Sequence, residues 1–330
     1  MPTCVGMTRK ANAEGSMVWA FGIIPVDSTP RPGRSAPMLP RRALLTGLMT
    51  CPAFGGAVAA EAGAQDRFFT ASDGVRLHYL DAGRASHDKV IVLVPGWTMP
   101  AWIWEAQIKA FSQRHRVIAF DPRGQGRSDV PARGYDHTSR GRDMGDLIAH
   151  IGVPRVVVAA WSLGVLDTLA YVHTHGDARL AGLVLVDNSV GEDPPPPPPP
   201  TLAPNQPIPP PPPHAEAMRR FVAGMFRTHR DPAYLDRLTQ ATLRTPEPAA
   251  RALLAYPVPR TYWKEAVFAV TRPVLYVVRP RWVPQAANLA LHRPGTETEV
   301  FAEAGHALFV DEPARFNAVV ESFIQRRVWP

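Results

Sequence analysis

Residues 156–167 read VVVAAWSLGVLD, and the change of pattern inside this stretch decides the fold. Its first residues, Val156 to Ala160, are apolar and suited to an extended chain, as in a parallel strand buried on both faces. The segment from Leu163 to His173 has the composition of a helix. Ser162 is therefore expected in a tight turn that leads from a strand into a helix.

The alternation seen at Ser162 continues through the chain from Arg67 onward. Short β-rich runs and amphipathic segments follow one another, which is typical of a mostly parallel sheet with helices on both faces. The expected strands lie near residues 67–70, 75–80, 89–94, 116–120, 155–160, 182–187, 273–278 and 297–301. The expected helices of this sheet domain lie near residues 104–113, 138–151, 163–175 and 312–326.

The composition indicates a globular protein. The 330 residues are 45% hydrophobic, which is enough for one sizeable core. Of the net charge of +7, residues 1–61 contribute six basic against three acidic side chains, and the remainder contributes 30 against 26, or +4. Such a weak excess does not favour a nucleic-acid partner. The expected partner is a small molecule, and no oligomeric state is predicted.

Residues 38–64 have the pattern of an export signal. The pair Arg41 and Arg42 precedes an uncharged stretch and then small residues suited to cleavage near Ala60 or Ala64. This pattern resembles a twin-arginine signal, which predicts a periplasmic or secreted protein without stable membrane insertion after cleavage. Because residues 1–37 would bury the signal inside the chain, we expect translation to begin at Met38.

Two alternatives for this leader stay open. The uncharged stretch is about as long as a minimal membrane span, although its Gly, Ala, Thr and Pro content makes it a poor anchor. Lipid attachment at Cys51 is the second alternative. Both cysteines, Cys4 and Cys51, precede the folded part, so we expect no disulfide in the mature domain.

The pattern changes between Asp187 and Pro273. A proline-rich strap, residues 188–214, must be extended, and it serves either as a spacer or as a ligand for a proline-recognition module. Helical segments follow near residues 215–228, 231–243, 247–255 and 261–269. The predicted organisation is a leader over 1–64, a core over 65–187 and 273–330, the strap over 188–214 and a helical cap over 215–272.

Ser162 lies in a pattern that carries chemistry. Residues 160–164 read AWSLG, which is G-x-S-x-G with alanine at the first small position. A nucleophile on a tight turn needs small neighbours two positions away, so that strand and helix can approach without a clash. Ser162 is therefore the candidate nucleophile. A serine that merely caps a helix is the alternative interpretation.

A candidate oxyanion hole follows the third expected strand, in LVPGWT at residues 93–98. Acyl transfer builds negative charge on a carbonyl oxygen, and backbone N–H groups stabilise that charge without reorganisation. Trp97 and Leu163 are the expected donors. The alternative is an ordinary turn between a strand and a loop, for which Pro and Gly are well suited.

His306 is the candidate general base. It lies in EAGHALF, residues 303–309, between an expected strand and the last helix. An imidazole has a pKa near working pH without any tuning, and it can take the proton of a serine hydroxyl. His306 also follows Ser162 in the chain order expected for a nucleophile on this kind of turn.

With these motifs, residues 67–327 resemble the α/β-hydrolase superfamily. The segment RVIAFDPRGQGRS at 116–128, followed by GYD at 134–136, resembles the branch that holds cofactor-free haloperoxidases and small esterases. The resemblance implies a mostly parallel eight-stranded sheet with helices on both faces and a helical cap inserted after the sixth strand. Many relatives have His where this chain has Pro95. The motif residues interpreted as a structural turn are Asp121, Arg123, Gly124, Gly126 and Ser128.

The expected third member of a catalytic triad is missing from its usual place. Relatives supply the acid after the seventh strand, but residues 277–284 read VVRPRWVP and contain none. Asp187, at the end of the sixth strand, is the leading replacement because it lies on the same sheet edge as Ser162 and His306. Glu192, Asp193, a Ser-His dyad without an acid, and a purely structural Asp187 are the alternatives.

The sequence thus predicts a serine hydrolase that acts on an ester-like carbonyl of an apolar small molecule through an acyl-enzyme intermediate. No metal site or cofactor is expected. Perhydrolase or haloperoxidase-like activity, acyl transfer, carbon–carbon bond hydrolysis and a non-catalytic ligand-binding protein are alternatives. The expected pocket walls are Trp97, Trp161 and Phe309, with Phe221, Phe226, Tyr256, Tyr262 or Trp263 from the cap.

Overall fold

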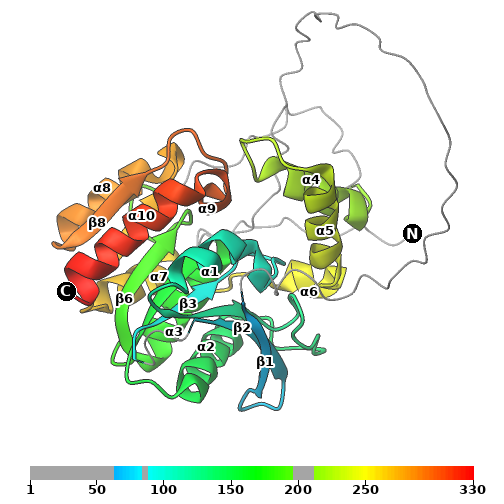
Figure 1. Cartoon of the computed structure of the whole chain (residues 1–330), viewed down its shortest axis with the longest axis horizontal. Coiled ribbons are helices and arrows are strands. Elements are labelled where there is room, and N and C mark those ends of the chain that lie inside the picture. The colour runs from blue at the N-terminus through cyan, green and yellow to red at the C-terminus, as the bar shows by residue number, and fades with distance from the viewer. Residues whose placement is uncertain (1–62, 84–87, 196–211) are drawn as a thin grey trace, which may run out of the picture.

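The computed structural model describes residues 63–83, 88–195 and 212–330 (Figure 1). The predictions of an export signal, a membrane anchor and lipid attachment at Cys51 fall on residues outside these ranges, as does most of the strap. Among the residues that are described, no helix is both long enough and apolar enough to cross a membrane.

Eight strands form one sheet in the order β1-β2-β4-β3-β5-β6-β7-β8. Their bounds are β1 Gln65–Thr70, β2 Arg76–Ala82, β3 Val90–Val94, β4 Arg116–Asp121, β5 Val156–Trp161, β6 Leu180–Val186, β7 Val274–Val278 and β8 Thr296–Val300. The pairs β1/β2 and β2/β4 are antiparallel, and all other neighbours are parallel. The predicted mostly parallel eight-stranded sheet is confirmed.

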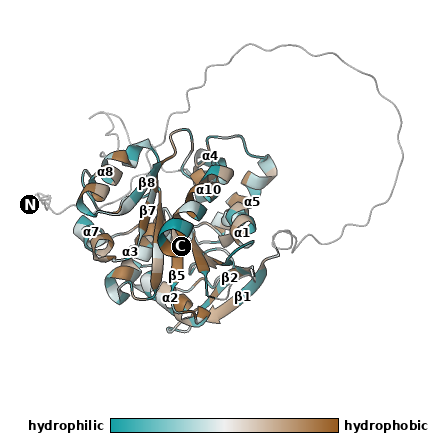
Figure 2. Cartoon of the chain, turned by 60° about the vertical axis from the view of Figure 1, so that its left-hand side comes forward, coloured by the Kyte–Doolittle hydropathy of each residue, from teal (hydrophilic) through white to brown (hydrophobic). Residues whose placement is uncertain are grey.

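Helices cover both faces of this sheet. Their bounds are α1 Glu105–Phe111, α2 His137–Ile151, α3 Leu163–His175, α4 His214–Gly224, α5 Pro232–Leu243, α6 Glu247–Ala252, α7 Arg260–Ala269, α8 Val283–His292, α9 Leu308–Asp311 and α10 Pro313–Phe323. Alternate strand residues point to opposite faces. Val92 and Val158 belong to the core layer with α2, α3, α7 and α8, whereas Ile91 and Val157 belong to the layer with α1 and α10. Figure 2 shows the hydrophobic strands between the helices.

Local signals fix both ends of α2 and the start of α8. Asp136 accepts a hydrogen bond from the Ser139 backbone N–H at 2.9 Å and caps α2, which ends at Gly152 with a φ of 77°. The helix α8 was not among the helices predicted from the sequence. Pro284 lies in the first turn of α8, where its missing N–H has no cost.

Four helices lie between β6 and β7, close to the predicted segments. Figure 1 shows α4, α5 and α6 grouped together, whereas α7 packs against α3 in the layer on the sheet. On α7, Tyr262 and Trp263 contact the rings of His137 and His173. The predicted cap range of 215–272 therefore includes one helix of the sheet layer, and the division of the chain into domains stays a prediction.

Candidate active site

Ser162 occupies the turn between β5 and α3. Its φ of 54° and ψ of −122° are unusual for a side chain other than glycine. The Ser162 N–H donates to the Val186 carbonyl at 2.9 Å, and the Asn188 side-chain amide donates to the Ser162 carbonyl at 2.8 Å. These bonds hold the turn from the neighbouring strand β6, so the sheet itself maintains the strained backbone.

Three loops at one edge of the sheet share this strain. Within the described ranges, the non-glycine residues with positive φ are Thr98, Ser162 and Asp187, which follow β3, β5 and β6. These strands are parallel neighbours, so their carboxyl ends meet at the same edge. Strained backbone of this kind is concentrated at functional sites, and all three residues belong to segments in which the sequence predicts chemistry.

The structure brings Ser162, His306 and Asp187 together. His306 Nε2 lies 2.9 Å from Ser162 Oγ, and His306 Nδ1 lies 2.6 Å from Asp187 Oδ2. An ionised carboxylate can only accept, so Nδ1 carries the proton that it donates to Asp187. The unprotonated Nε2 then accepts the hydrogen bond from the Ser162 hydroxyl. This arrangement is suited to removing the hydroxyl proton.

Arg279 is a fourth member of this cluster that the sequence analysis missed. It stands after β7, where relatives usually have the acid. Its Nε donates to Asp187 Oδ2 at 2.6 Å, and its backbone N–H donates to Asp187 Oδ1 at 3.1 Å. The guanidinium of Arg279, after β7, thus holds the carboxylate of Asp187, after β6. Arg279 and His306 therefore share Asp187 Oδ2 as an acceptor, which brings Arg279 Nη2 to within 3.4 Å of His306 Nδ1.

The carboxyl group of Asp187 is fully buried. Burial on its own would raise the pKa of Asp187, but the hydrogen bond and charge of His306, together with Arg279, outweigh it and lower the pKa. Asp187 is therefore ionised at neutral pH. An ionised carboxylate at this position fixes the His306 tautomer and would stabilise an imidazolium.

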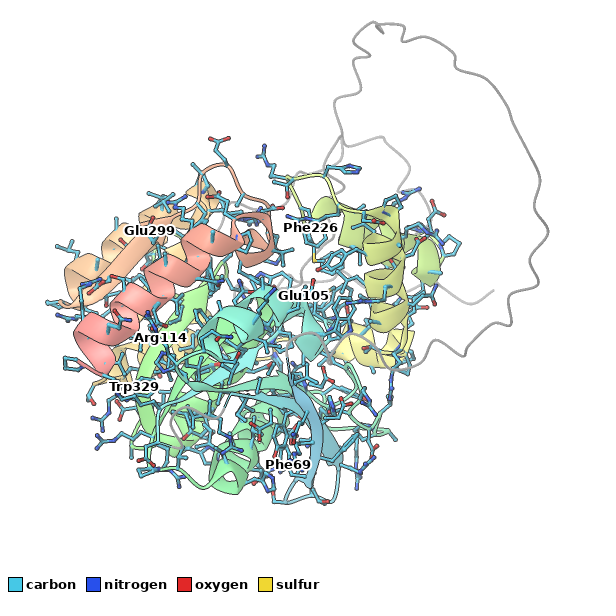
Figure 3. All side chains as sticks on the ribbon, viewed as in Figure 1. Phe69, Glu105, Arg114, Phe226, Glu299 and Trp329 are labelled. Atoms are coloured by element: carbon cyan, nitrogen blue, oxygen red, sulfur yellow. The ribbon has the colours of Figure 1, made fainter. Side chains whose placement is uncertain are left out.

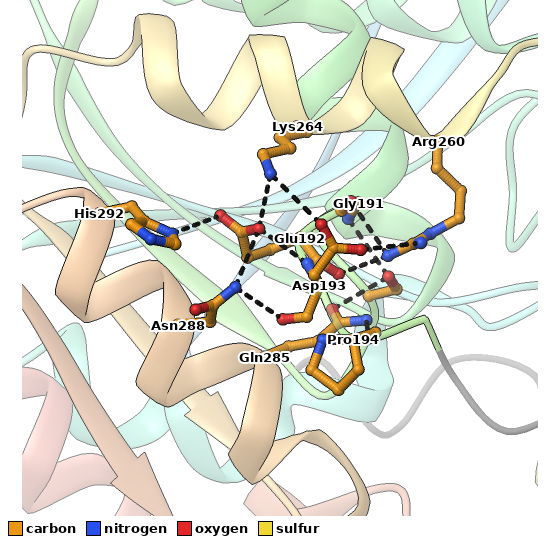
Figure 4. Close-up of polar contacts among 10 residues, drawn as sticks. Gly191, Glu192, Asp193, Pro194, Arg260, Lys264, Gln285, Asn288 and His292 are labelled. Atoms are coloured by element: carbon orange, nitrogen blue, oxygen red, sulfur yellow. Dashed lines mark hydrogen bonds and ion pairs between the residues drawn. The ribbon is translucent and has the colours of Figure 1, made fainter.

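The two other carboxylates considered for the acid lie in the separate cluster shown in Figure 4. Glu192 Oε1 accepts from Lys264 Nζ at 2.8 Å, and Asp193 Oδ1 lies 3.4 Å from Arg260 Nη1. These pairs tie the segment after β6 to α7. No hydrogen bond or ion pair joins either carboxylate to His306 within the described part of the chain. Their contacts are structural.

The loop after β3 passes directly beside Ser162. A Cβ atom added to Gly96 would lie only 2.9 Å from the Ser162 Cβ. Gln125, which is fully buried, holds this loop: its Nε2 donates to the Gly96 and Met99 carbonyls, both at 3.0 Å, and its Oε1 accepts from the Thr98 N–H at 3.2 Å. Gln125 was not predicted from the sequence. The only signal for it was a side-chain amide between Gly124 and Gly126, which can hydrogen-bond to the backbone of a neighbouring loop.

Of the two expected oxyanion donors, Leu163 directly follows Ser162 in the chain, and Trp97 follows Gly96, the residue that packs against the Ser162 side chain. Leu163 is the first residue of α3, where a helix N–H has no partner within the helix. Trp97 lies between Gly96 and Thr98 in the loop that Gln125 holds. This placement is compatible with an oxyanion hole, and the assignment of both donors stays a prediction.

The three predicted wall residues have different surroundings. The Trp97 indole N–H donates to a backbone carbonyl of α6 at 2.7 Å, and its ring contacts Phe221. The Trp161 indole N–H donates to the His306 carbonyl at 2.8 Å. Phe309 is fully buried and stacks on Trp104 with ring centroids 3.8 Å apart. Trp97 therefore links the core to the inserted helices. Trp161 packs against the rings of both His306 and Phe309 and so supports the His306 loop. A role in substrate contact stays a prediction for all three.

A model of the family described as "Alpha/beta hydrolase family" matches residues 91–319, which is more than half of the chain. The chain belongs to this family. A non-heme haloperoxidase of Rhodococcus erythropolis is 37% identical over 120 residues, which cover 36% of this chain and 43% of that protein. The non-heme chloroperoxidase CPO-A1 of Kitasatospora aureofaciens is 34% identical over 118 residues, 36% of this chain and 42% of that protein. The similarity thus spans less than half the length of these curated relatives.

Solved structures of similar fold cover more of the chain. An esterase, RhEst1, from Rhodococcus sp. ECU1013 aligns with a TM-score of 0.63 and 24% identity, over 79% of this chain and 99% of that one. A bromoperoxidase from Bacillus anthracis aligns with a TM-score of 0.64 and 16% identity, over 79% of this chain and 100% of that one. At these identities the likeness shows the fold alone. The predicted α/β-hydrolase fold and the resemblance to haloperoxidases and esterases are confirmed.

Gly164 offers a test of the close packing at the turn of this alpha/beta hydrolase. A Cβ at Gly164 would lie 2.7 Å from the Pro95 carbonyl oxygen and 2.8 Å from that of Val94, both of which are backbone atoms. Gly164→Ala should therefore push α3 away from the loop after β3, lower the free energy of unfolding by about 1–3 kcal/mol and reduce hydrolase kcat by roughly 10- to 100-fold.

The matched control is Gly224→Ala, because a Cβ there meets nothing within 4 Å. Gly224→Ala should leave activity unchanged and leave stability equal or slightly higher. Urea unfolding and turnover of a p-nitrophenyl ester measure both quantities. Equal behaviour of the two variants would contradict the tight approach described at Gly164.

Proposed function

We propose that this alpha/beta hydrolase is a serine hydrolase that cleaves an ester-like carbonyl through an acyl-enzyme intermediate. The observation that carries the proposal is the chain of hydrogen bonds from the Ser162 hydroxyl through His306 to the buried, ionised Asp187. A serine hydroxyl is a weak nucleophile unless a base is within hydrogen-bond reach. The nucleophile's identity separates this proposal from relatives of the fold that attack with aspartate.

In the first half of the reaction, His306 Nε2 takes the hydroxyl proton as Ser162 Oγ attacks the carbonyl carbon. The positive charge that forms on the imidazole is stabilised by Asp187, which remains ionised. Collapse of the tetrahedral intermediate breaks the bond to the leaving alcohol, and His306 returns the proton to the alcohol oxygen. The acyl group is then bonded to Ser162.

In the second half, His306 takes a proton from water, and the resulting hydroxide equivalent attacks the acyl carbonyl. Ser162 leaves with the proton that His306 carries, and a carboxylic acid is released. Negative charge develops on the carbonyl oxygen in both halves, and we propose that the Trp97 and Leu163 backbone N–H groups stabilise it. Gln125 supports this role because it fixes the loop on both sides of Trp97.

The proposed substrate is a small, apolar ester. The aromatic rings of Trp97 and Phe221, which lie in T-shaped contact with centroids 5.0 Å apart, favour an acyl or aryl group over a charged one. Hydrogen peroxide in place of water would release a peracid instead, and the names of the haloperoxidase relatives favour this as the second candidate function. Both reactions use the same acyl-enzyme intermediate.

Two predictions from the sequence complete the proposal. Export rests on the paired Arg41 and Arg42 and the cleavable stretch that follows them. The helical cap rests on α4, α5 and α6, which are inserted between β6 and β7 and contact Trp97 through α4 and α6. An inserted cap of this kind would close over the substrate.

Activity on a panel of p-nitrophenyl esters of different acyl length tests the proposed function. We expect turnover of at least one ester, with a burst of nitrophenol that equals the enzyme concentration if deacylation is slow. In the presence of a halide salt, which a peracid oxidises, halogenation that appears only when peroxide and a carboxylic acid are both added would support the second candidate. Ligand binding without turnover of any ester would contradict the hydrolase proposal and favour a non-catalytic binding protein.

A further inference from the structure

A hollow of about 190 Å³ lies at the Arg279 side of the proposed triad. Three chain segments line it: the loop after β7, the loop after β8 and the loop after α4. Figure 3 labels Phe226 in the loop after α4, which meets the His306 loop through a hydrogen bond from the Ala307 N–H to the Met225 carbonyl at 3.1 Å. The lining residues are Arg227, Arg279, Pro280, Arg281, Ala302 and Ala304.

The hollow holds more positive charge than its surroundings neutralise. Three of its lining residues are arginines, and none is acidic. Arg279 is paired with Asp187, but in the described ranges no carboxylate pairs with the guanidinium of Arg227 or of Arg281. Arg279 and Arg281 carry like charges and line the same hollow. A bound anion would relieve this repulsion between like charges.

We propose that this hollow binds a small monocarboxylate. Guanidinium groups present N–H donors in a planar fork that matches the two oxygens of a carboxylate. Pro280, Ala302 and Ala304 supply an apolar wall for a short carbon chain. Arg281 lies over the Trp282 ring at 4.6 Å, which orients its guanidinium at the rim of the hollow.

Arg279 couples this site to the proposed triad. Its Nε and the His306 Nδ1 both donate to Asp187 Oδ2, each at 2.6 Å. A carboxylate in the hollow competes with Asp187 for the Arg279 donors and loosens the clamp on the acid. This second step rests on the proposed function, because ester cleavage releases a carboxylate beside the hollow and its binding there would lower kcat.

Equilibrium binding of propionate tests the site itself. The titration follows the unfolding temperature of Ser162→Ala, a background without turnover, at constant ionic strength maintained with chloride. We expect a saturable stabilisation by propionate that weakens by roughly tenfold or more in apparent affinity when R227Q and R281Q are added together. Both side chains are exposed, so the double variant should fold.

The matched control is the pair R133Q and R219Q, which removes the same charge from exposed positions away from the hollow. This control pair should keep the propionate affinity within about twofold of that of the Ser162→Ala background. Equal loss in both double variants would overturn the site in favour of a general charge effect. Inorganic phosphate in place of propionate distinguishes the ligand class, and tighter binding of phosphate would overturn the assignment to a carboxylate.

Inhibition kinetics of the enzyme with intact Ser162 test the coupling separately. Propionate should lower kcat for a p-nitrophenyl ester, and the decrease should be smaller in the R227Q and R281Q double variant. A rise in KM alone, with kcat constant, would overturn the coupling and indicate competition in the ester site. Failure of the enzyme to turn over any ester would contradict the proposed function. The propionate titration would still show whether the hollow binds a carboxylate.

Discussion

Ser162→Ala should reduce kcat for a p-nitrophenyl ester by roughly 10⁶-fold, with the fold unchanged. The substitution removes the atom that lies 2.9 Å from His306 Nε2 and leaves every backbone hydrogen bond of the turn in place. Because Ser162 and His306 act as one unit, removal of either member alone should abolish nearly all of the covalent pathway. Steady-state kinetics and the unfolding temperature of both proteins measure the effect.

Ser189→Ala is the matched control for this prediction. Ser189 lies at the same edge of the sheet, but its Oγ donates to Gln285 Oε1 at 3.1 Å and not to His306. We expect Ser189→Ala to keep turnover within about tenfold of the wild type. Residual activity of Ser162→Ala at the level of Ser189→Ala would mean that another group attacks the ester.

Asp187→Asn should lower kcat by about 10⁴-fold and change KM little. An asparagine has the same shape, but its amide cannot accept from both His306 Nδ1 and Arg279 Nε with the strength of a carboxylate. The imidazole then loses the partner that fixes its tautomer and stabilises its charge. Kinetics across a range of ester concentrations separate kcat from KM.

Glu192→Gln provides the comparison for Asp187→Asn. Glu192 is a buried carboxylate five residues further along the same segment, and it pairs with Lys264. Glu192→Gln should lower the free energy of unfolding and keep kcat within about tenfold of the wild-type value. The reverse pattern, with Glu192→Gln inactive and Asp187→Asn active, would move the acid role to Glu192. Unchanged turnover in both variants would favour a Ser-His dyad.

The pH dependence of stability gives Asp187→Asn a second readout. Because the folded state lowers the pKa of Asp187, the stabilisation from its ionised form is complete above about 3.9, the value of an unfolded aspartate, and is lost as pH falls through the lower folded value. The stability gap between wild type and variant should therefore be constant near neutral pH and shrink in strong acid. Urea unfolding across this range measures it.

The sequence predicted those parts of the molecule that depend on local pattern. Short β-rich runs predicted the eight strands found in the described part of the chain, and the position of Ser162 between such a run and a helical segment predicted the turn. Asp187 was predicted from its place at the end of β6, since the carboxyl ends of parallel strands share one edge. The structure brings its carboxylate to His306, at the distance that a hydrogen bond requires.

The contacts of Arg279 and of Gln125 with distant segments escaped prediction. Arg279 was noted only as the absence of an acid, because no local pattern indicates that a guanidinium after β7 reaches a carboxylate after β6. The clamp of Gln125 on the loop after β3 depends on the packing of two strand ends, which sequence spacing does not reveal. The helix α8 was also missed, although Pro284 is a residue type that is common in the first turn of a helix.

Mass spectrometry of the intact protein after exposure to a fluorophosphonate tests the central claim most directly. We expect one covalent adduct per chain, located on the peptide that contains Ser162 and absent from Ser162→Ala. The label should form slowly in Asp187→Asn, because the hydroxyl there lacks a fully effective base. An unlabelled wild-type protein, or an adduct on a different residue, would contradict the assignment of Ser162 as an activated nucleophile.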